Sequence, residues 1–262
     1  MLRKNLLLPG VLLIFLLYGT NQLSRAFYQQ PSVKSVYEAN GRPAVLKIPN
    51  NKTYKIEFWT DPTPAVELEE RVTSNCSDNH FAGSMRKAAK TSTPPSSAYQ
   101  PFTKISDIFS VYHLPGDDQM PSQVTRSSPR IAIEKKGVVL NNVYLYAFTR
   151  ESDNDYHLIV GDAPTRTTAT LMNMEISGLP TPDNSALDKA RAAFVAGLNL
   201  NDQTCLSGYV VLMDNPIPIH IEGPVFYDID HKPGTIGPVK GSVSLRPKTS
   251  WEIHPITKFA LR

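Results

Sequence analysis

The sequence has few cysteines, few glycines and no long apolar run, and each shortage excludes a class of protein. Cysteine accounts for 2 of the 262 residues, too few for a disulfide-rich scaffold or a cysteine-based metal motif. The 14 glycines form no phosphate-binding loop after a strand, and no serine lies in a nucleophile elbow. Nucleotide hydrolysis and serine or cysteine hydrolase chemistry therefore have no support in the sequence.

A basic surface for nucleic acid is missing from the C-terminal half. The formal net charge is +3, but residues 131–262 hold 12 Lys and Arg against 14 Asp and Glu, a charge of −2, which leaves +5 for residues 1–130. Binding to phosphates needs clustered Lys and Arg. A nucleic-acid partner is therefore less expected than a saccharide, a peptide or a protein.

The N-terminus has the pattern of an export signal. Arg3 and Lys4 precede an apolar stretch from Leu6 to Leu17, and Ser24-Arg25-Ala26 supplies small residues for signal peptidase. The apolar stretch is shorter than the roughly 20 residues that span a bilayer as a helix. The sequence predicts a signal peptide at residues 1–26, a periplasmic or extracellular location and no transmembrane span after cleavage. An uncleaved membrane anchor is the alternative.

The two cysteines follow the predicted signal. An exported protein permits a disulfide between Cys76 and Cys205, and two unpaired thiols are the alternative.

Strand signals dominate the C-terminal half and favour a mainly β fold. Short runs of β-branched and aromatic residues between turn formers cover 131–148, 156–161, 168–176, 217–226 and 251–261. Residues 185–196 have helical spacing and end at a glycine. One helix between the third and fourth strands predicts a five-stranded OB-like Greek-key barrel.

The composition also predicts domain boundaries. Residues 91–104 begin with a polar, proline-rich stretch that is typical of a linker. We expect this linker to separate a small β-containing N-terminal region at 27–90 from the barrel domain at 105–262.

Polar side chains lie on or beside three of the predicted strands. Because alternate residues of a strand face the same side, Asp155 shares a face with His157, and Glu252 shares one with His254. Asp228 and His231 follow the fourth strand. If these faces converge, they offer ligands for zinc or another divalent ion, or a base oriented by a carboxylate. The alternative is structural: the polar groups satisfy one another.

Aromatic residues near these positions are candidates for a binding groove. OB barrels stack bases or sugars on aromatic side chains, and core packing is the alternative role. The candidate binding residues are Tyr156, His157, Phe226, Tyr227 and Trp251.

Four spaced motifs carry a resemblance to a known group of proteins. They are Asp153-Asn-Asp155-Tyr156-His157-Leu158 with Asp162, Lys189-Ala-Arg191-Ala-Ala-Phe194, Gly223-Pro-Val-Phe226-Tyr-Asp228 with His231, and Trp251-Glu-Ile-His254-Pro255-Ile256. With them, residues 131–260 resemble uncharacterised bacterial exported proteins that have an OB-like β-barrel domain. The resemblance implies a fold and an exported location but no activity. The chain departs from the group between His231 and Trp251, where a Lys- and Pro-containing insertion replaces a short Gly-rich turn.

These patterns lead to two functional hypotheses. The first is an exported, non-enzymatic OB-like binding or envelope-associated module of unknown ligand. The second is a metal-dependent hydrolase, of a phosphodiesterase or nuclease type, that uses the His, Asp and Glu groups with a divalent metal ion as cofactor. No single residue is assigned as catalytic.

Overall fold

A computed structural model of the chain describes residues 45–49, 51–59, 78–115, 119–180, 184–202, 206 and 208–262. The predicted signal peptide at 1–26 and the two cysteines, Cys76 and Cys205, lie outside the described residues. Within the described part of the chain, every helix is too short or too polar to cross a bilayer.

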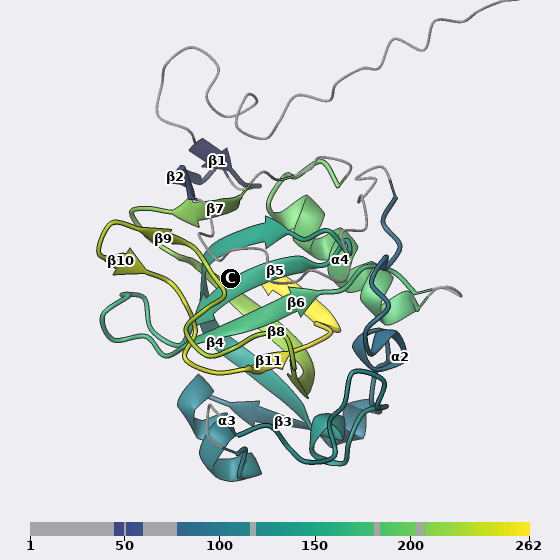
Figure 1. The fold of residues 1–262 in the computed structure, drawn as a ribbon. Helices are drawn as coiled ribbons and strands as arrows, with labels where there is room; N and C mark the ends of the chain where they lie inside the picture. The colour runs from purple at the N-terminus through teal and green to yellow at the C-terminus, as the bar shows by residue number, and fades with distance from the viewer. Residues whose placement is uncertain are drawn as a thin grey trace, which may run out of the picture. The chain divides into compact units, whose positions relative to one another are not determined.

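Strands account for most of the regular structure (Figure 1). They are β1 (Val45–Lys47), β2 (Thr53–Trp59), β3 (Tyr99–Phe102), β4 (Gly137–Arg150), β5 (Tyr156–Gly161), β6 (Leu171–Ile176), β7 (Tyr209–Leu212), β8 (Ile217–Tyr227), β9 (Val239–Lys240), β10 (Val243–Ser244), β11 (Trp251–Ile253) and β12 (Lys258–Leu261). The helical segments are α2 (Lys87–Lys90), η1 (Ser96–Ala98), α3 (Ile105–Tyr112), η2 (Ile133–Lys135) and α4 (Ser185–Gly197).

Five strands close into a barrel in the order β4-β5-β6-β11-β8, because β8 pairs back onto β4. Neighbouring strands are antiparallel except β6 and β11, which run parallel. The prediction of a mainly β protein with few helices and a five-stranded barrel is confirmed.

The long strand β4 makes closure possible. It pairs with β8 and β7 along one edge and with β5 and β3 along the other. Its register shifts between Leu140 and Val143 against β8, and between Leu145 and Ala147 against β5. Such irregularities bend a strand and increase its twist, so β4 can curve around the barrel.

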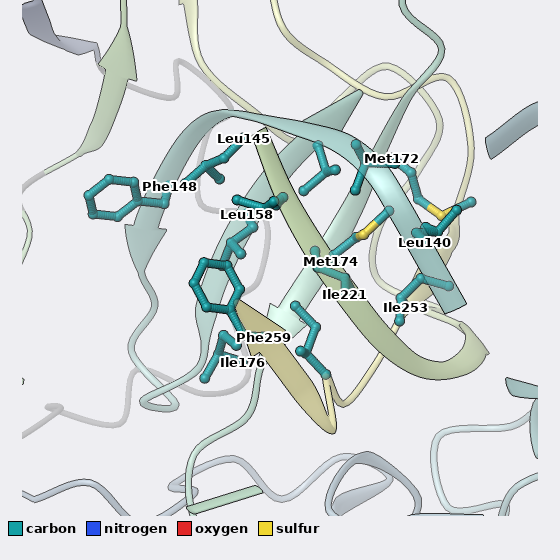
Figure 2. Close-up of a cluster of buried hydrophobic side chains, with 14 of the residues drawn as sticks. Leu140, Leu145, Phe148, Leu158, Met172, Met174, Ile176, Ile221, Ile253 and Phe259 are labelled. Atoms are coloured by element: carbon teal, nitrogen blue, oxygen red, sulfur yellow. The ribbon is translucent and has the colours of Figure 1, made fainter. Parts of the chain in front are cut away.

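The inside of the barrel is apolar (Figure 2). Leu158 of β5, Met174 of β6 and Ile253 of β11 are fully buried there. Because side chains alternate along a strand, the residues beside them point to the outer face. The polar groups predicted from the sequence therefore lie outside the barrel and need another cover.

Segments before residue 105 join the barrel sheet. β2 pairs with β7, and β3 runs parallel to β4. Within the predicted linker at 91–104, residues 99–102 form strand β3. Phe102 is buried and packs edge-to-face on Tyr112 of α3, with ring centroids 5.2 Å apart. The apolar residues that follow the proline-rich stretch anchor it to the sheet. The predicted division into 27–90, a linker at 91–104 and 105–262 stays a prediction.

One close approach between strands gives a direct test of the fold. A Cβ on Gly223 of β8 would lie 2.6 Å from both Ile253 Cγ2 and the backbone oxygen of Pro255. We expect Gly223→Ala to lower the free energy of unfolding by about 1–3 kcal/mol, since the backbone oxygen cannot move alone. Urea denaturation measures the change.

Gly197, at the end of α4, is the matched control. A Cβ there would meet its nearest neighbour, Leu261 Cγ, at an ordinary 3.4 Å. Gly197→Ala should leave stability unchanged or raise it by up to about 1 kcal/mol, because alanine favours the helix. Equal stability of the two variants would contradict the described packing of β8 against residues 253–256.

Candidate functional site

The outer face of the barrel carries a row of ionisable side chains across three neighbouring strands. His157 of β5 lies directly opposite Glu175 of β6 in the antiparallel register. Ile253 of β11 pairs with Met174 of β6, which places Glu252 and His254 beside Glu175. Sheet register alone thus brings two histidines to opposite sides of one carboxylate.

Loops at the strand ends add three more groups. Asp155 immediately precedes β5, and its Oδ1 accepts a hydrogen bond of 2.5 Å from the Gly178 amide. Asp228 follows β8, and its Oδ1 accepts a hydrogen bond of 2.8 Å from the amide of Asp230. His231 lies three residues further along the same loop.

All seven side chains are removed from solvent. The most exposed residue, His231, has 7% of its surface accessible, and Glu175, Asp155 and His254 have 0%. We call the set the buried cluster: Asp155, His157, Glu175, Asp228, His231, Glu252 and His254.

Glu175 is at the centre of the buried cluster. Its Oε1 lies 2.6 Å from Nε2 of His157, and its Oε2 contacts Nδ1 of His254. Each oxygen of the Glu175 carboxylate therefore contacts a different imidazole.

The other carboxylates surround the remaining ring nitrogens. His254 Nδ1 is 3.1 Å from Glu252 Oε1, and His254 Nε2 is 3.5 Å from Asp155 Oδ2. His231 Nδ1 is 3.4 Å from the second oxygen of Glu252. The rings of His157 and His231 meet edge-to-face, with centroids 4.9 Å apart.

Many of these atoms approach one another without the alignment of a hydrogen bond. Among the described residues, no aligned partner is found for Asp155 Oδ2, His157 Nδ1, both oxygens of Glu175, Asp228 Oδ2, His231 Nδ1, Glu252 Oε2 or His254 Nε2. A buried polar atom without a partner costs about 1–3 kcal/mol. So dense a group of buried acceptors requires positive charge, from protons or from metal ions.

Lys90 of α2 supplies one such charge. Its Nζ lies 3.2 Å from Asp228 Oδ2. Burial opposes the charged form of Lys90, but the carboxylate of Asp228 outweighs that cost and raises the lysine pKa well above its ordinary value. Lys90 is therefore a permanent cation at the edge of the buried cluster.

The histidines show the same competition between burial and carboxylates. Burial disfavours the imidazolium of His254, but Glu175 and Glu252 outweigh it and raise its pKa to about 10. Asp228 and Glu252 likewise overcome burial and raise the pKa of His231 to about 9. The pKa of His157 is also raised, chiefly by Glu175 against the cost of burial.

The carboxylates respond in opposite directions. Burial would raise the pKa of Glu175, but His157 and His254 hold it well below its usual range. Burial raises the pKa of Asp155 well above its ordinary value, and the nearby Asp153 adds to that shift. The two carboxyl groups therefore differ in how readily they give up a proton.

Two buried arginines fix the backbone under the site. Arg130 donates to the backbone oxygens of His254 and Val225, and Arg86 donates to both oxygens of Glu134 and to the backbone oxygen of Tyr227. Their guanidinium groups lie 5.3 Å and 4.4 Å from the ring centroid of Phe226, respectively. These contacts hold the ends of β8 and β11 in place.

In the described part of the chain, three sets of residues have ligand atoms within 4.8 Å of one another. They are His157, Glu175 and His231; Glu175, Asp228, His231 and Glu252; and Asp155, Glu175 and His254. Imidazole nitrogen and carboxylate oxygen atoms are suitable ligands for zinc and other divalent first-row ions. The six residues predicted as metal ligands, Asp155, His157, Asp228, His231, Glu252 and His254, all lie in these sets.

The aromatic residues predicted to form a binding groove are core instead. Tyr156, Phe226, Tyr227 and Trp251 are at most 6% exposed. Tyr156, Tyr227 and Trp251 belong to the main core, because strand alternation directs them away from the polar outer face. Phe226 is on the outer face but is covered by the two arginines. Only His157 of the predicted groove is part of the polar site.

Sequence reasoning missed two members of the site. Glu175 carries the same signal as the predicted pairs, since Asn173 and Glu175 alternate with apolar residues in β6. Lys90 has no comparable signal, because its neighbours in sequence indicate only a basic surface segment. Its role depends on the path of residues 78–92 to the barrel.

Comparisons of the chain with protein-family models, curated proteins and solved structures found no match. The fold and the site define it as a β-barrel protein with a buried histidine and carboxylate cluster, and any function must be argued from that geometry.

The pKa shifts predict how stability depends on pH in protein freed of metal by chelator. His231 and His254 have folded-state pKa values of about 9 and about 10, above the unfolded value near 6.5. Their stabilising effect is complete below about pH 6.5 and is lost as the pH rises through 9 and 10. Urea denaturation between pH 6 and pH 10 should show a loss on the order of 1–3 kcal/mol or more.

His254→Gln should flatten this pH dependence, while His80→Gln, at a site 52% exposed, should keep the wild-type slope. A wild-type stability that is constant from pH 6 to pH 10 would contradict ionised histidines in the buried cluster.

Proposed function

We propose that this protein is an exported OB-like β-barrel whose buried cluster binds a divalent transition-metal ion. The observation that carries the proposal is the set of seven buried side chains with metal-ligating groups. Among the described residues, most of the ligand atoms that face one another in this set have no aligned hydrogen bond. The predicted signal peptide supports export, and the strand connectivity supports the OB-like interpretation.

The connectivity argument uses the order of strands around the barrel. β4, β5 and β6 form a meander, β11 inserts between β6 and β8, and β8 closes on β4. In the chain, α4 lies after β6 and before β8. A meander followed by a helix and two closing strands is the arrangement expected of an OB-like Greek-key barrel.

The charge balance supports a bound cation. With neutral imidazoles, the four carboxylates of the buried cluster face one lysine, Lys90, and the excess negative charge must be balanced. Protons on the three histidines would cancel this excess of three negative charges, and a divalent metal ion would cancel two of them. Protons and metal compete for the same nitrogen atoms, so the two states can be separated by experiment.

Burial of the site favours a closed metal centre. A structural metal is enclosed by protein ligands, whereas a catalytic metal keeps a position open for water or substrate. The ligands here come from β5, β6, β11 and the loop after β8, so one ion would tie four segments together. The ion would thereby stabilise the fold directly.

A metal-dependent hydrolase is the second candidate, supported by one edge of the site. Glu151 is 37% exposed on its side chain, and its Oε1 lies 3.6 Å from Nδ1 of His157. This is where a substrate would reach the ion, with Glu151 as a base. Hydrolysis of a phosphodiester by zinc-loaded protein, lost in Glu151→Gln with metal content unchanged, would support this candidate; no hydrolysis would remove it.

Zinc should stabilise the protein through the buried cluster. At a free Zn²⁺ concentration 100-fold above the dissociation constant, the free energy of unfolding should rise by about 2.7 kcal/mol. Thermal and urea unfolding with and without chelator measure the change, and elemental analysis after gel filtration measures bound metal.

The double variant His157→Gln/His254→Gln should lose both bound metal and the stabilisation. His80→Gln, which alters an exposed histidine paired with Asp78, should retain both. Metal-free protein whose stability is the same in zinc and in chelator would overturn the proposal and leave protons as the balancing charge.

A further inference from the structure

Glu175 is common to all three potential ligand sets of the buried cluster. His157 and His254 never occur in the same set, and neither do His231 and His254. The sets therefore separate His157 and His231 from His254, and the carboxylate of Glu175 is common to both groups.

The register of the sheet explains this division. β6 lies between β5 and β11, so His157 and His254 reach Glu175 from opposite sides. Neighbouring strands are about 4.8 Å apart, so the strands that carry the two histidines are separated by about twice that distance. A single zinc ion binds nitrogen atoms at about 2.0–2.1 Å and cannot serve both sides equally.

We infer that the buried cluster holds two divalent ions bridged by the carboxylate of Glu175, an inference that rests on the proposed metal-binding function. One ion takes His157 and His231. The other takes His254 and Asp155. Each ion binds one oxygen of Glu175, and paired ions in proteins lie about 3.5–4 Å apart.

The remaining carboxylates fit this division. Asp228 and Glu252 share a set with His231, so they complete the position of the first ion. The Oε1 of Glu252 lies 3.1 Å from His254 Nδ1 and its other oxygen faces His231, so this carboxylate reaches both positions. Lys90 pairs with Asp228 at the outer edge and limits the negative charge of the first position.

Unpartnered atoms lie on both sides of Glu175. Among the described residues, Glu175 Oε1 and His231 Nδ1 lack an aligned partner on one side, and Glu175 Oε2 and Asp155 Oδ2 lack one on the other. A single ion could satisfy only one of these pairs. The second pair would remain buried without a partner at a cost of about 1–3 kcal/mol for each atom.

The test is the stoichiometry and coupling of cobalt, a paramagnetic substitute for zinc. The full chain, stripped with chelator and titrated with Co²⁺ alone, should bind two ions per chain. Electron paramagnetic resonance should show magnetic coupling between them because they share a carboxylate. These measurements use the wild-type protein and do not depend on any variant folding.

The variants separate the two positions. His157→Gln and His254→Gln should each bind one ion per chain with an uncoupled signal, and Glu175→Gln should weaken binding of both ions at least tenfold. His80→Gln should behave as wild type, and circular dichroism identifies any variant that fails to fold.

The outcomes distinguish this inference from the proposed function. One ion per chain in wild-type protein, or two ions without coupling, would overturn the bridged pair while metal binding stands. No bound ion would overturn the proposed function and the inference together.

Discussion

The carboxylate of Glu175, buried between two imidazoles on the outside of the barrel, is the constraint that the surrounding structure must satisfy. An isolated buried carboxylate is very costly, and it persists only when cations and hydrogen bonds compensate for its lost hydration. His157 and His254 flank it in the register of the sheet, and this arrangement lowers its pKa. Each imidazole then needs its own counter-charge, which Glu252, Asp155 and their neighbours supply. The buried cluster therefore extends outward from Glu175, and Lys90 is the cation at its edge.

The interior of the barrel is apolar. At the buried cluster the outer face of the barrel is polar, and other segments of the chain shield it from solvent. Strand alternation separates the two within single strands: Leu158 and Met174 fill the interior, and His157 and Glu175 face out. Arg86 and Arg130 close the outer layer by donating to backbone oxygens on β8 and beside β11. The buried cluster therefore lies between a rigid closed sheet and a charged cover, and the sheet fixes the spacing of its strand-borne members.

Period-two patterns in the sequence predict much of this arrangement. Asp155 with His157 and Glu252 with His254 can be placed on shared faces without coordinates, and the barrel strands follow from short β-branched runs. The same alternation directs Tyr156 and Trp251 into the core. The sequence does not reveal which face of a strand is covered, so it predicts a groove of aromatic residues at positions that the structure buries. Glu175 could have been found from Asn173 and Glu175 alternating within an apolar strand. Lys90, Arg86 and β3 could not, because their roles depend on contacts distant in sequence.

The cover and the buried cluster depend on each other. Residues 78–92 join the barrel through backbone hydrogen bonds from Phe81 to Leu179 and from Ala82 to Asp153, and the second of these leads to the turn that positions Asp155. The same segment carries Arg86 and Lys90 to the far side of the site. If residues 78–92 moved away from the barrel, water would reach the buried cluster and its charges would no longer need to pair. If the charges of the buried cluster were no longer balanced, Lys90 would lose its partner, and residues 78–92 would lose a contact that holds them to the barrel. A closed ionic centre of this kind couples segments distant in sequence more tightly than apolar packing alone, since unpaired charge is penalised more than a small cavity.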